Sequence, residues 1–199
     1  RRHLDRSVRQ WRRRREVQGA CREALFRVER REGLTDMRFW GVTGTNGKTS
    51  TVYFVQQLMN LLGHKAVSIG TIGQDGCWGH IDGHMTTLSP ENLAQTLYDL
   101  EQKGTEIVAM EASSHGLDQG RLCGHHLCGG AFTNLTRDHL DYHKTMENYL
   151  QAKAHLFDEL MDETGVAVLN ADIPEYETLK KMALGRNQRV ISYGKNADT

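Results

Sequence analysis

The stretch Arg38-Phe-Trp-Gly-Val-Thr-Gly-Thr-Asn-Gly-Lys-Thr-Ser50 decides the fold of this chain. Its first residues suit a buried strand, and from Thr49 an apolar helical pattern continues to a stop at Gly63. Between them, Gly44 and Gly47 permit the positive φ angles and close backbone approach of a tight turn. Backbone N–H groups at such a helix N-terminus attract an anion, and the helix dipole adds to this attraction. The stretch therefore predicts a phosphate-binding loop.

Two side chains of this loop suit nucleotide chemistry. Lys48 would reach the outer phosphates, and the Thr49 hydroxyl would face a magnesium ion. The match to the general pattern G-x-x-x-x-G-K-[ST] is imperfect, because Val42 stands where the first glycine belongs and Gly41 lies one residue early. A tight strand–helix turn with a solvated lysine is the alternative. The order of strand, turn and helix favours the phosphate loop.

Composition limits the class of protein. A chain of 199 residues can hold one sizeable core, and 38% hydrophobic residues without a long apolar run predict a protein with no membrane span. Residues 1–31 contain twelve Arg and four acidic residues, a local charge of +8, which leaves −8 for the rest of a chain whose net charge is +0. A uniformly nucleic-acid-binding surface is therefore not indicated, and we expect nucleic acid not to be a partner.

The basic segment 1–32 differs in composition from the rest of the chain and is not expected to belong to the core. It is open to three interpretations: an arm for nucleic acid or membrane, a targeting segment, or sequence foreign to the natural domain. Because the chain begins with Arg, we expect a fragment or a processed form. No signal peptide is visible, which favours a cytoplasmic protein.

A group of Cys and His residues, Cys123-Gly-His-His-Leu-Cys128, invites a zinc interpretation. Its spacing fits no common zinc pattern, so we expect ordinary reduced thiols there and at Cys21 and Cys77.

Strands and helices alternate after residue 36, which predicts an α/β domain with a mainly parallel sheet flanked by helices. Expected strands cover 38–43, 66–72, 106–111, 131–133, 166–170 and 190–193, and expected helices cover 49–62, 90–103, 146–162 and 174–184. Ser89 is the expected cap of the second helix, and 73–83 is expected to be a glycine-rich loop.

Polar segments follow three of these strands: 43–48, 111–115 and 134–139. Ligands bind at the carboxyl ends of strands in such sheets, so the three segments are expected to meet at one edge. Glu111 ends an apolar strand, where a carboxylate is either a metal ligand or the partner of a nearby cation. The segment Asp138–His143 is rich in oxygen and nitrogen ligands, although His is an unusual ligand for magnesium.

Lys153 falls on the apolar stripe of helix 146–162. On an inward face its pKa would fall, and the neutral amine could react with carbon dioxide to give a carbamate that binds metal. The alternative, which the residues alone favour, is that its stem carries the ammonium group out to solvent.

Taken together, these residues resemble the Mur ligase family, and most of all the member that adds the third residue of the peptidoglycan stem peptide. The matching stretches are Gly41-Val-Thr-Gly-Thr-Asn-Gly-Lys-Thr, Ala109-Met-Glu-Ala-Ser-Ser-His-Gly-Leu and Thr133-Asn-Leu-Thr-Arg-Asp-His-Leu-Asp-Tyr-His. The first stretch alone also fits folylpolyglutamate synthase. Met85 and Leu88 depart from residues frequent in the family.

The resemblance implies a role for each matching position. Catalytic residues would be Lys48 and a carbamylated Lys153; the ATP phosphates would be bound by Gly44, Thr45, Asn46, Gly47, Lys48, Thr49 and Ser50. Two magnesium ions would be held by Thr49, Glu111, His139 and Lys153. The UDP-muramoyl substrate would be bound by Thr86, Thr87, Ser113, Gln119 and Arg121.

The implied activity is ATP-dependent amide ligation. A diamino acid, meso-diaminopimelate or L-lysine, would be added to UDP-N-acetylmuramoyl-L-alanyl-D-glutamate through an acyl phosphate. Residues 33–199 would be the central ATP-binding domain, without the C-terminal ligase domain, so the chain alone is expected to be inactive. We expect a monomer. Two other functions stay open: a nucleotide-binding module with a basic nucleic-acid-binding arm, and a ligase like folylpolyglutamate synthase.

Overall fold

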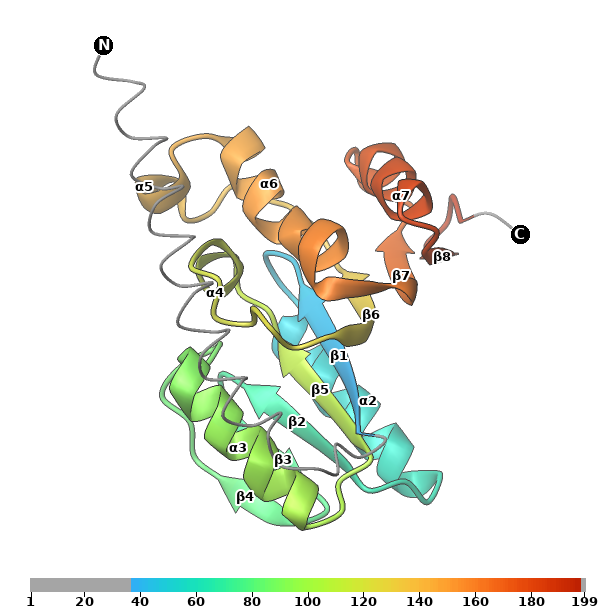
Figure 1. The fold of residues 1–199 in the computed structure, drawn as a ribbon. Helices are drawn as coiled ribbons and strands as arrows, with labels where there is room; N and C mark the ends of the chain where they lie inside the picture. Colours follow the sequence, from blue (N-terminus) through green and yellow to red (C-terminus); the bar gives the residue numbers. More distant parts are fainter. Residues whose placement is uncertain (1–36, 198–199) are drawn as a thin grey trace.

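The computed structural model describes residues 37–197 of the chain (Figure 1). The basic segment 1–32, Cys21 and the expected domain boundary at residue 33 lie outside these residues.

One mainly parallel sheet organises the described part of the chain. Its strands follow the order β4-β3-β2-β5-β1-β6-β7-β8. Their bounds are β1 Arg38–Thr43, β2 Ala66–Gly70, β3 Gly73–Gly76, β4 Gly79–Ile81, β5 Ile107–Glu111, β6 Leu127–Phe132, β7 Met161–Asn170 and β8 Arg189–Tyr193. β1 pairs in parallel with β5 on one side and β6 on the other, so the carboxyl ends of these three strands meet at one edge, as the sequence predicted.

Helices cover both faces of this sheet. Their bounds are α2 Lys48–Leu61, α3 Pro90–Gln102, α4 Ser114–Asp118, α5 Leu140–His143, α6 Met146–His155, a π-helical turn η1 Leu156–Leu160 and α7 Tyr176–Gly185. Ser89 caps α3 by accepting a hydrogen bond from the Asn92 N–H, as expected.

The alternation of side chains along β5 divides the apolar core in two. Val108 and Met110 pack with the buried leucines of α3, in a cluster that also contains residues of η1 and α7. Ala109 points to the opposite face and packs with Val42 and with Val52 of α2. Figure 1 shows the same arrangement, with α2 behind the sheet and α3 in front. The predicted α/β fold is confirmed.

Three local expectations were wrong. The glycine-rich loop 73–83 contains the antiparallel strands β3 and β4, which are built around positive-φ glycines at 73, 76 and 79. β6 begins at Leu127, four residues before the expected strand, because Gly129 and Gly130 hide its pattern. The ring of Trp40 packs against Gly129, whose added Cβ would meet that ring at 2.2 Å. The helix expected to reach residue 162 ends as the π-turn η1, and β7 begins directly at Met161.

Candidate active site

The loop between β1 and α2 is packed tightly against the segment that follows β6. Gly44 has φ 140°, and a Cβ added there would meet Thr133 Oγ1 at 1.9 Å. The Thr133 hydroxyl donates to the Asn46 carbonyl at 2.7 Å. Glycine is therefore required at position 44 for both conformation and space.

Asn134 fixes the next part of this loop. Its side-chain oxygen accepts from the Asn46 N–H at 2.9 Å, and its backbone oxygen accepts from the Thr45 N–H at 2.9 Å. The Thr45 hydroxyl in turn accepts from the Thr136 N–H at 3.0 Å. The sequence singled out the loop but gave no sign of these partners, which lie about ninety residues away and depend on the pairing of β1 with β6.

The N-terminus of α2 leaves room for an anion. Gly47 caps the helix without a side-chain hydrogen bond, and the first turn holds no acidic residue. Its leading N–H groups have no acceptor within the helix. Lys48, Thr49 and Ser50 lie in this turn. The positions predicted to bind phosphate are thus brought together in a geometry that fits one.

Lys48 turns back over the loop. Its Nζ donates to the carbonyls of Gly44 at 3.0 Å and Thr45 at 2.8 Å. Burial lowers the pKa of Lys48, whereas the charges of Glu111 and Asp138 act to raise it. The ammonium group is therefore held by the loop carbonyls, and the charges of the two carboxylates favour its protonated form.

Lys153 of α6 reaches the same loop. It is 1% exposed, and its Nζ donates to the Gly44 carbonyl at 2.7 Å. The amine also lies 4.4 Å from the centre of the Tyr149 ring. Burial, with the charge of Lys48 adding to it, lowers the pKa of Lys153 to about 7, and Asp138 opposes the shift. The interpretation in which this side chain reaches solvent is wrong.

Glu111 is buried at the end of β5, with 1% exposure. Its two oxygens accept from the Thr71 N–H at 2.7 Å and the Thr71 hydroxyl at 3.3 Å. Gly70 makes room for it, because a Cβ there would meet the carboxylate at 2.1 Å. Each carboxylate oxygen retains a lone pair, so the group can still accept a cation.

His139 lies on the exposed side of the site and adopts a left-handed conformation with φ 50°. Its ring contacts those of His115 and Tyr149, with centroids 4.9 and 6.1 Å apart. Among the described residues, no hydrogen bond or ion pair joins His139 to Glu111, so their pairing as metal ligands stays a prediction.

Most of the predicted substrate-binding residues form one hydrogen-bonded group. The Thr87 hydroxyl donates to the Glu111 carbonyl at 2.9 Å and lies 3.0 Å from Ser113 Oγ. Arg121 donates to the Thr87 carbonyl at 2.8 Å and, through two nitrogens, to the Gln119 side-chain oxygen. Thr86 is linked to the group through the Thr71 hydroxyl at 3.0 Å. The structure therefore brings these positions to the edge that holds Glu111.

Sequence reasoning missed a buried polar pair at this edge. His143 Nε2 and the Ser114 hydroxyl lie 3.0 Å apart, and both residues are buried. Burial lowers the pKa of His143 to about 4. The motif Asp138–His143 was recognised as rich in ligands, but the contact between α5, which ends at His143, and α4, which begins at Ser114, was not visible in the sequence.

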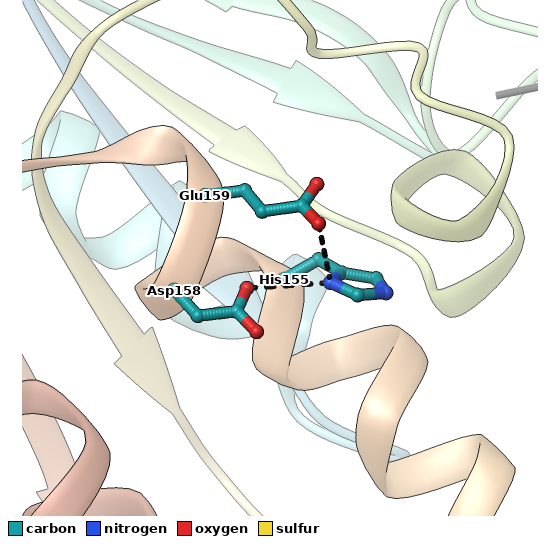
Figure 2. A group of neighbouring side chains, drawn as sticks. All are labelled: His155, Asp158 and Glu159. Atoms are coloured by element: carbon teal, nitrogen blue, oxygen red, sulfur yellow. Dashed lines mark hydrogen bonds and ion pairs between the residues drawn. The ribbon is translucent and has the colours of Figure 1, made fainter. Parts of the chain in front are cut away.

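One further group of ligand-type side chains lies on the end of α6 and on η1 (Figure 2). His155 Nδ1 lies 3.2 Å from Asp158 Oδ1 and 3.3 Å from Glu159 Oε1. The spacings of three and four residues are those of ion pairs within one helix, and these contacts link α6 to the π-turn. The group is therefore explained by its structural role.

The expected thiol at Cys128 also has a structural partner, since its Sγ donates to the Phe39 carbonyl at 3.1 Å. No helix within residues 37–197 is both long and apolar enough to cross a membrane.

The chain is similar in sequence to known proteins. Residues 42–199 match the model of the Mur ligase middle domain. Over 157 residues the chain is 45% identical to UDP-N-acetylmuramoyl-L-alanyl-D-glutamate--2,6-diaminopimelate ligase from Bradyrhizobium diazoefficiens, in a match that covers 79% of this chain and 32% of that protein. The chain thus spans about a third of the length of the curated relatives it matches.

Solved structures show the same likeness. A UDP-N-acetylmuramoyl-L-alanyl-D-glutamate--2,6-diaminopimelate ligase superposes with a TM-score of 0.73 and 33% identity, covering 86% of this chain and 35% of that one. A bifunctional folylpolyglutamate synthase/dihydrofolate synthase with Mn, AMPPNP and L-glutamate bound superposes with a TM-score of 0.66 at 16% identity, over 86% of this chain and 46% of that one, which shows a shared fold alone. With more than half of its residues matched by the family model, the chain belongs to the Mur ligase family through its middle domain.

Proposed function

We propose that this chain is the ATP-binding part of a ligase that joins 2,6-diaminopimelate to UDP-N-acetylmuramoyl-L-alanyl-D-glutamate. One observation carries the proposal: Lys48 and the buried Lys153 converge on the Gly44 carbonyl of a phosphate loop. The cationic Lys48 and the N-terminus of a helix form a site for a highly charged anion, and the triphosphate of ATP is such an anion.

The nucleotide would be held by the loop and the first turn of α2. Gly44 to Gly47 would allow close approach of the phosphates, and the N–H groups of Lys48, Thr49 and Ser50 in the first turn of α2 would donate to them. Lys48 would exchange its bonds to the loop carbonyls for bonds to the outer phosphates. Its partial burial strengthens such an interaction, because water competes with it less.

Magnesium would be held at two places around this loop. The Thr49 hydroxyl suits the ion that accompanies the phosphates, and Glu111, His139 and a carbamylated Lys153 would hold a second ion. Lys153 fits this role, since a pKa of about 7 leaves much of the amine neutral and reactive at neutral pH. When bound, the ions would neutralise the charge of the transferred phosphoryl group.

The UDP-muramoyl substrate would lie along the group formed by Thr86, Thr87, Ser113, Gln119 and Arg121, next to Glu111. Arg121 offers a planar donor fork for a carboxylate or phosphate. Of the two departures from the family, Met85 is an exposed residue before Thr86, and Leu88 packs against the core.

The reaction would proceed in two steps. The D-glutamyl carboxylate attacks the γ-phosphorus of ATP, which releases ADP and leaves an acyl phosphate. The amine of the diamino acid then attacks the acyl carbon, releases phosphate and forms the amide. In the first step this chain's residues would orient the two reactants and stabilise charge through Lys48.

Diaminopimelate is the favoured amine because the relatives at about 45% identity are named for it. We keep L-lysine and the folylpolyglutamate-type reaction as the competing acceptor chemistries. A cytoplasmic monomer is the expected form, and the described residues include no membrane-spanning helix.

An acceptor assay tests the proposal. The coding sequence on both sides of the chain should be recovered, and the longer protein assayed for ATP hydrolysis with each acceptor. Stimulation by UDP-N-acetylmuramoyl-L-alanyl-D-glutamate together with meso-diaminopimelate is expected. Stimulation by a folate and glutamate instead would contradict it. The 199-residue chain alone is expected to form no tripeptide product, and detectable product would overturn that part.

A further inference from the structure

Tyr149 occupies a central position between the phosphate loop and α6, although it was not among the predicted site residues. It lies on α6, one turn before Lys153, and is 1% exposed. A tyrosine buried this deeply needs a partner for its hydroxyl, and its choice of partner is informative.

The hydroxyl of Tyr149 reaches the phosphate loop. It lies 3.3 Å from the Thr45 hydroxyl, which also accepts from the Thr136 N–H at 3.0 Å. Thr45 therefore joins the loop to α6 through Tyr149 and to the segment after β6 through Thr136.

The ring of Tyr149 faces the lysine. Lys153 Nζ lies 4.4 Å from the ring centre, so the ring face packs against the lysine nitrogen. The same Nζ donates to the Gly44 carbonyl, so the Tyr149 ring packs against the lysine nitrogen where that nitrogen contacts the loop. The rings of His139 and His143 pack nearby, at 6.1 and 5.1 Å between centroids.

We propose that Tyr149 is a positioning residue that couples the phosphate loop to Lys153: its hydroxyl fixes Thr45 and its ring holds the lysine amine against Gly44. This inference rests on the proposed nucleotide site and deepens it. Tyr149 acts through Thr45 and Lys153 rather than on the nucleotide itself.

Isothermal titration of magnesium-ATP into the 199-residue chain tests the hydroxyl. Tyr149→Phe removes the bond to Thr45 but keeps the ring, and we expect Kd to rise about 5-fold. In a Thr45→Val background the hydroxyl has lost this partner, so Tyr149→Phe should change Kd less than about 2-fold. Tyr53→Phe on α2 is the matched control, since no hydrogen bond of its hydroxyl is found among the described residues, and it should leave Kd unchanged.

Tyr149→Leu tests the ring. This substitution removes both the hydrogen bond to Thr45 and the ring that contacts Lys153. We expect a Kd about 3-fold higher than that of Tyr149→Phe. Circular dichroism and thermal unfolding of each variant show whether it is folded, and Tyr149→Phe retains the buried ring. If Tyr149→Phe binds as tightly as the original chain, or weakens binding equally in the Thr45→Val background, the coupling is overturned. If the original chain itself fails to bind ATP, the proposed function fails instead.

Discussion

Lys48 and Lys153 donate to the same acceptor, the carbonyl oxygen of Gly44, at 3.0 and 2.7 Å. Burial lowers the pKa of Lys153, and the charge of Lys48 lowers it further because two ammonium groups on one carbonyl would repel each other. The arrangement holds positive charge at the phosphate loop and keeps one of the two amines easy to deprotonate.

Gly44→Ala is expected to abolish ATP binding. Its Cβ would meet Thr133 Oγ1 at 1.9 Å, and φ 140° is unfavourable for alanine. The loop must move away from Thr133 and lose its geometry. Calorimetric titration with magnesium-ATP measures the effect. Gly185→Ala, which has open space around the added Cβ, is the control and should bind normally. Unchanged binding by Gly44→Ala would mean that the described loop conformation is not the binding one.

Lys153→Met should remove a pH dependence of stability. Because the pKa of Lys153 is about 7 in the folded chain and near 10.5 in the unfolded one, the unfolded chain binds more protons between these values. The free energy of unfolding should therefore rise with pH there, by about 1 kcal/mol per pH unit, relative to Lys153→Met. Urea unfolding between pH 7 and pH 9 measures the difference. Parallel curves for the two proteins would show that Lys153 titrates normally.

The lowered pKa of His143 predicts that the folded chain loses stability in acid. Burial lowers its pKa to about 4 in the folded chain, against 6.5 in the unfolded one, so the unfolded chain binds more protons between these values. Stability should fall as the pH falls from 6.5 toward 4. His143→Gln, which can still bond to Ser114, should show less of this fall in thermal unfolding. His126→Gln is the control, because His126 is exposed. An identical acid response in His143→Gln would contradict the assignment.

Glu111→Gln should separate stability from metal binding. The amide keeps the size of the side chain and one acceptor for Thr71, so the melting temperature should change by only a few degrees. Loss of the negative charge should weaken the magnesium dependence of ATP binding, which titrations with and without magnesium would measure. Glu163→Gln, at an exposed position, should behave like the original chain. If Glu111→Gln keeps the full magnesium dependence, Glu111 is only the structural partner of Thr71.

The sequence predicted those parts of the fold that have strong local signals. The apolar strand before Gly44, the helix after Gly47 and the cap at Ser89 were all found where expected. Parallel pairing of β1 with β5 and β6 followed from the alternation of elements, and it placed the three polar segments together. By contrast, the start of β6 was not predicted, because Gly129 and Gly130 are not typical strand residues. Glycine stands there because an added Cβ would meet the side chains of Trp40 and Leu156.

The candidate site could be predicted only in part, because several of its contacts depend on tertiary packing. The helical spacing of Lys153 indicated an inward position, but its burial depends on how α6 packs over the loop, and local pattern favoured the solvent-exposed alternative. The contacts Tyr149–Thr45 and His143–Ser114 join residues 104 and 29 positions apart. Such contacts arise from tertiary packing, so no local sequence pattern around either residue predicts them.

The most direct test of the account is the affinity of the 199-residue chain for magnesium-ATP, compared with that of Lys48→Met. Methionine keeps the length of the side chain without its charge or its hydrogen bonds. We expect saturable binding by the original chain and a loss of affinity of at least about 10-fold in the variant, since a charge-assisted hydrogen bond contributes roughly 1.5–3 kcal/mol. Equal affinity of the two proteins, or no binding by the original chain, would contradict it.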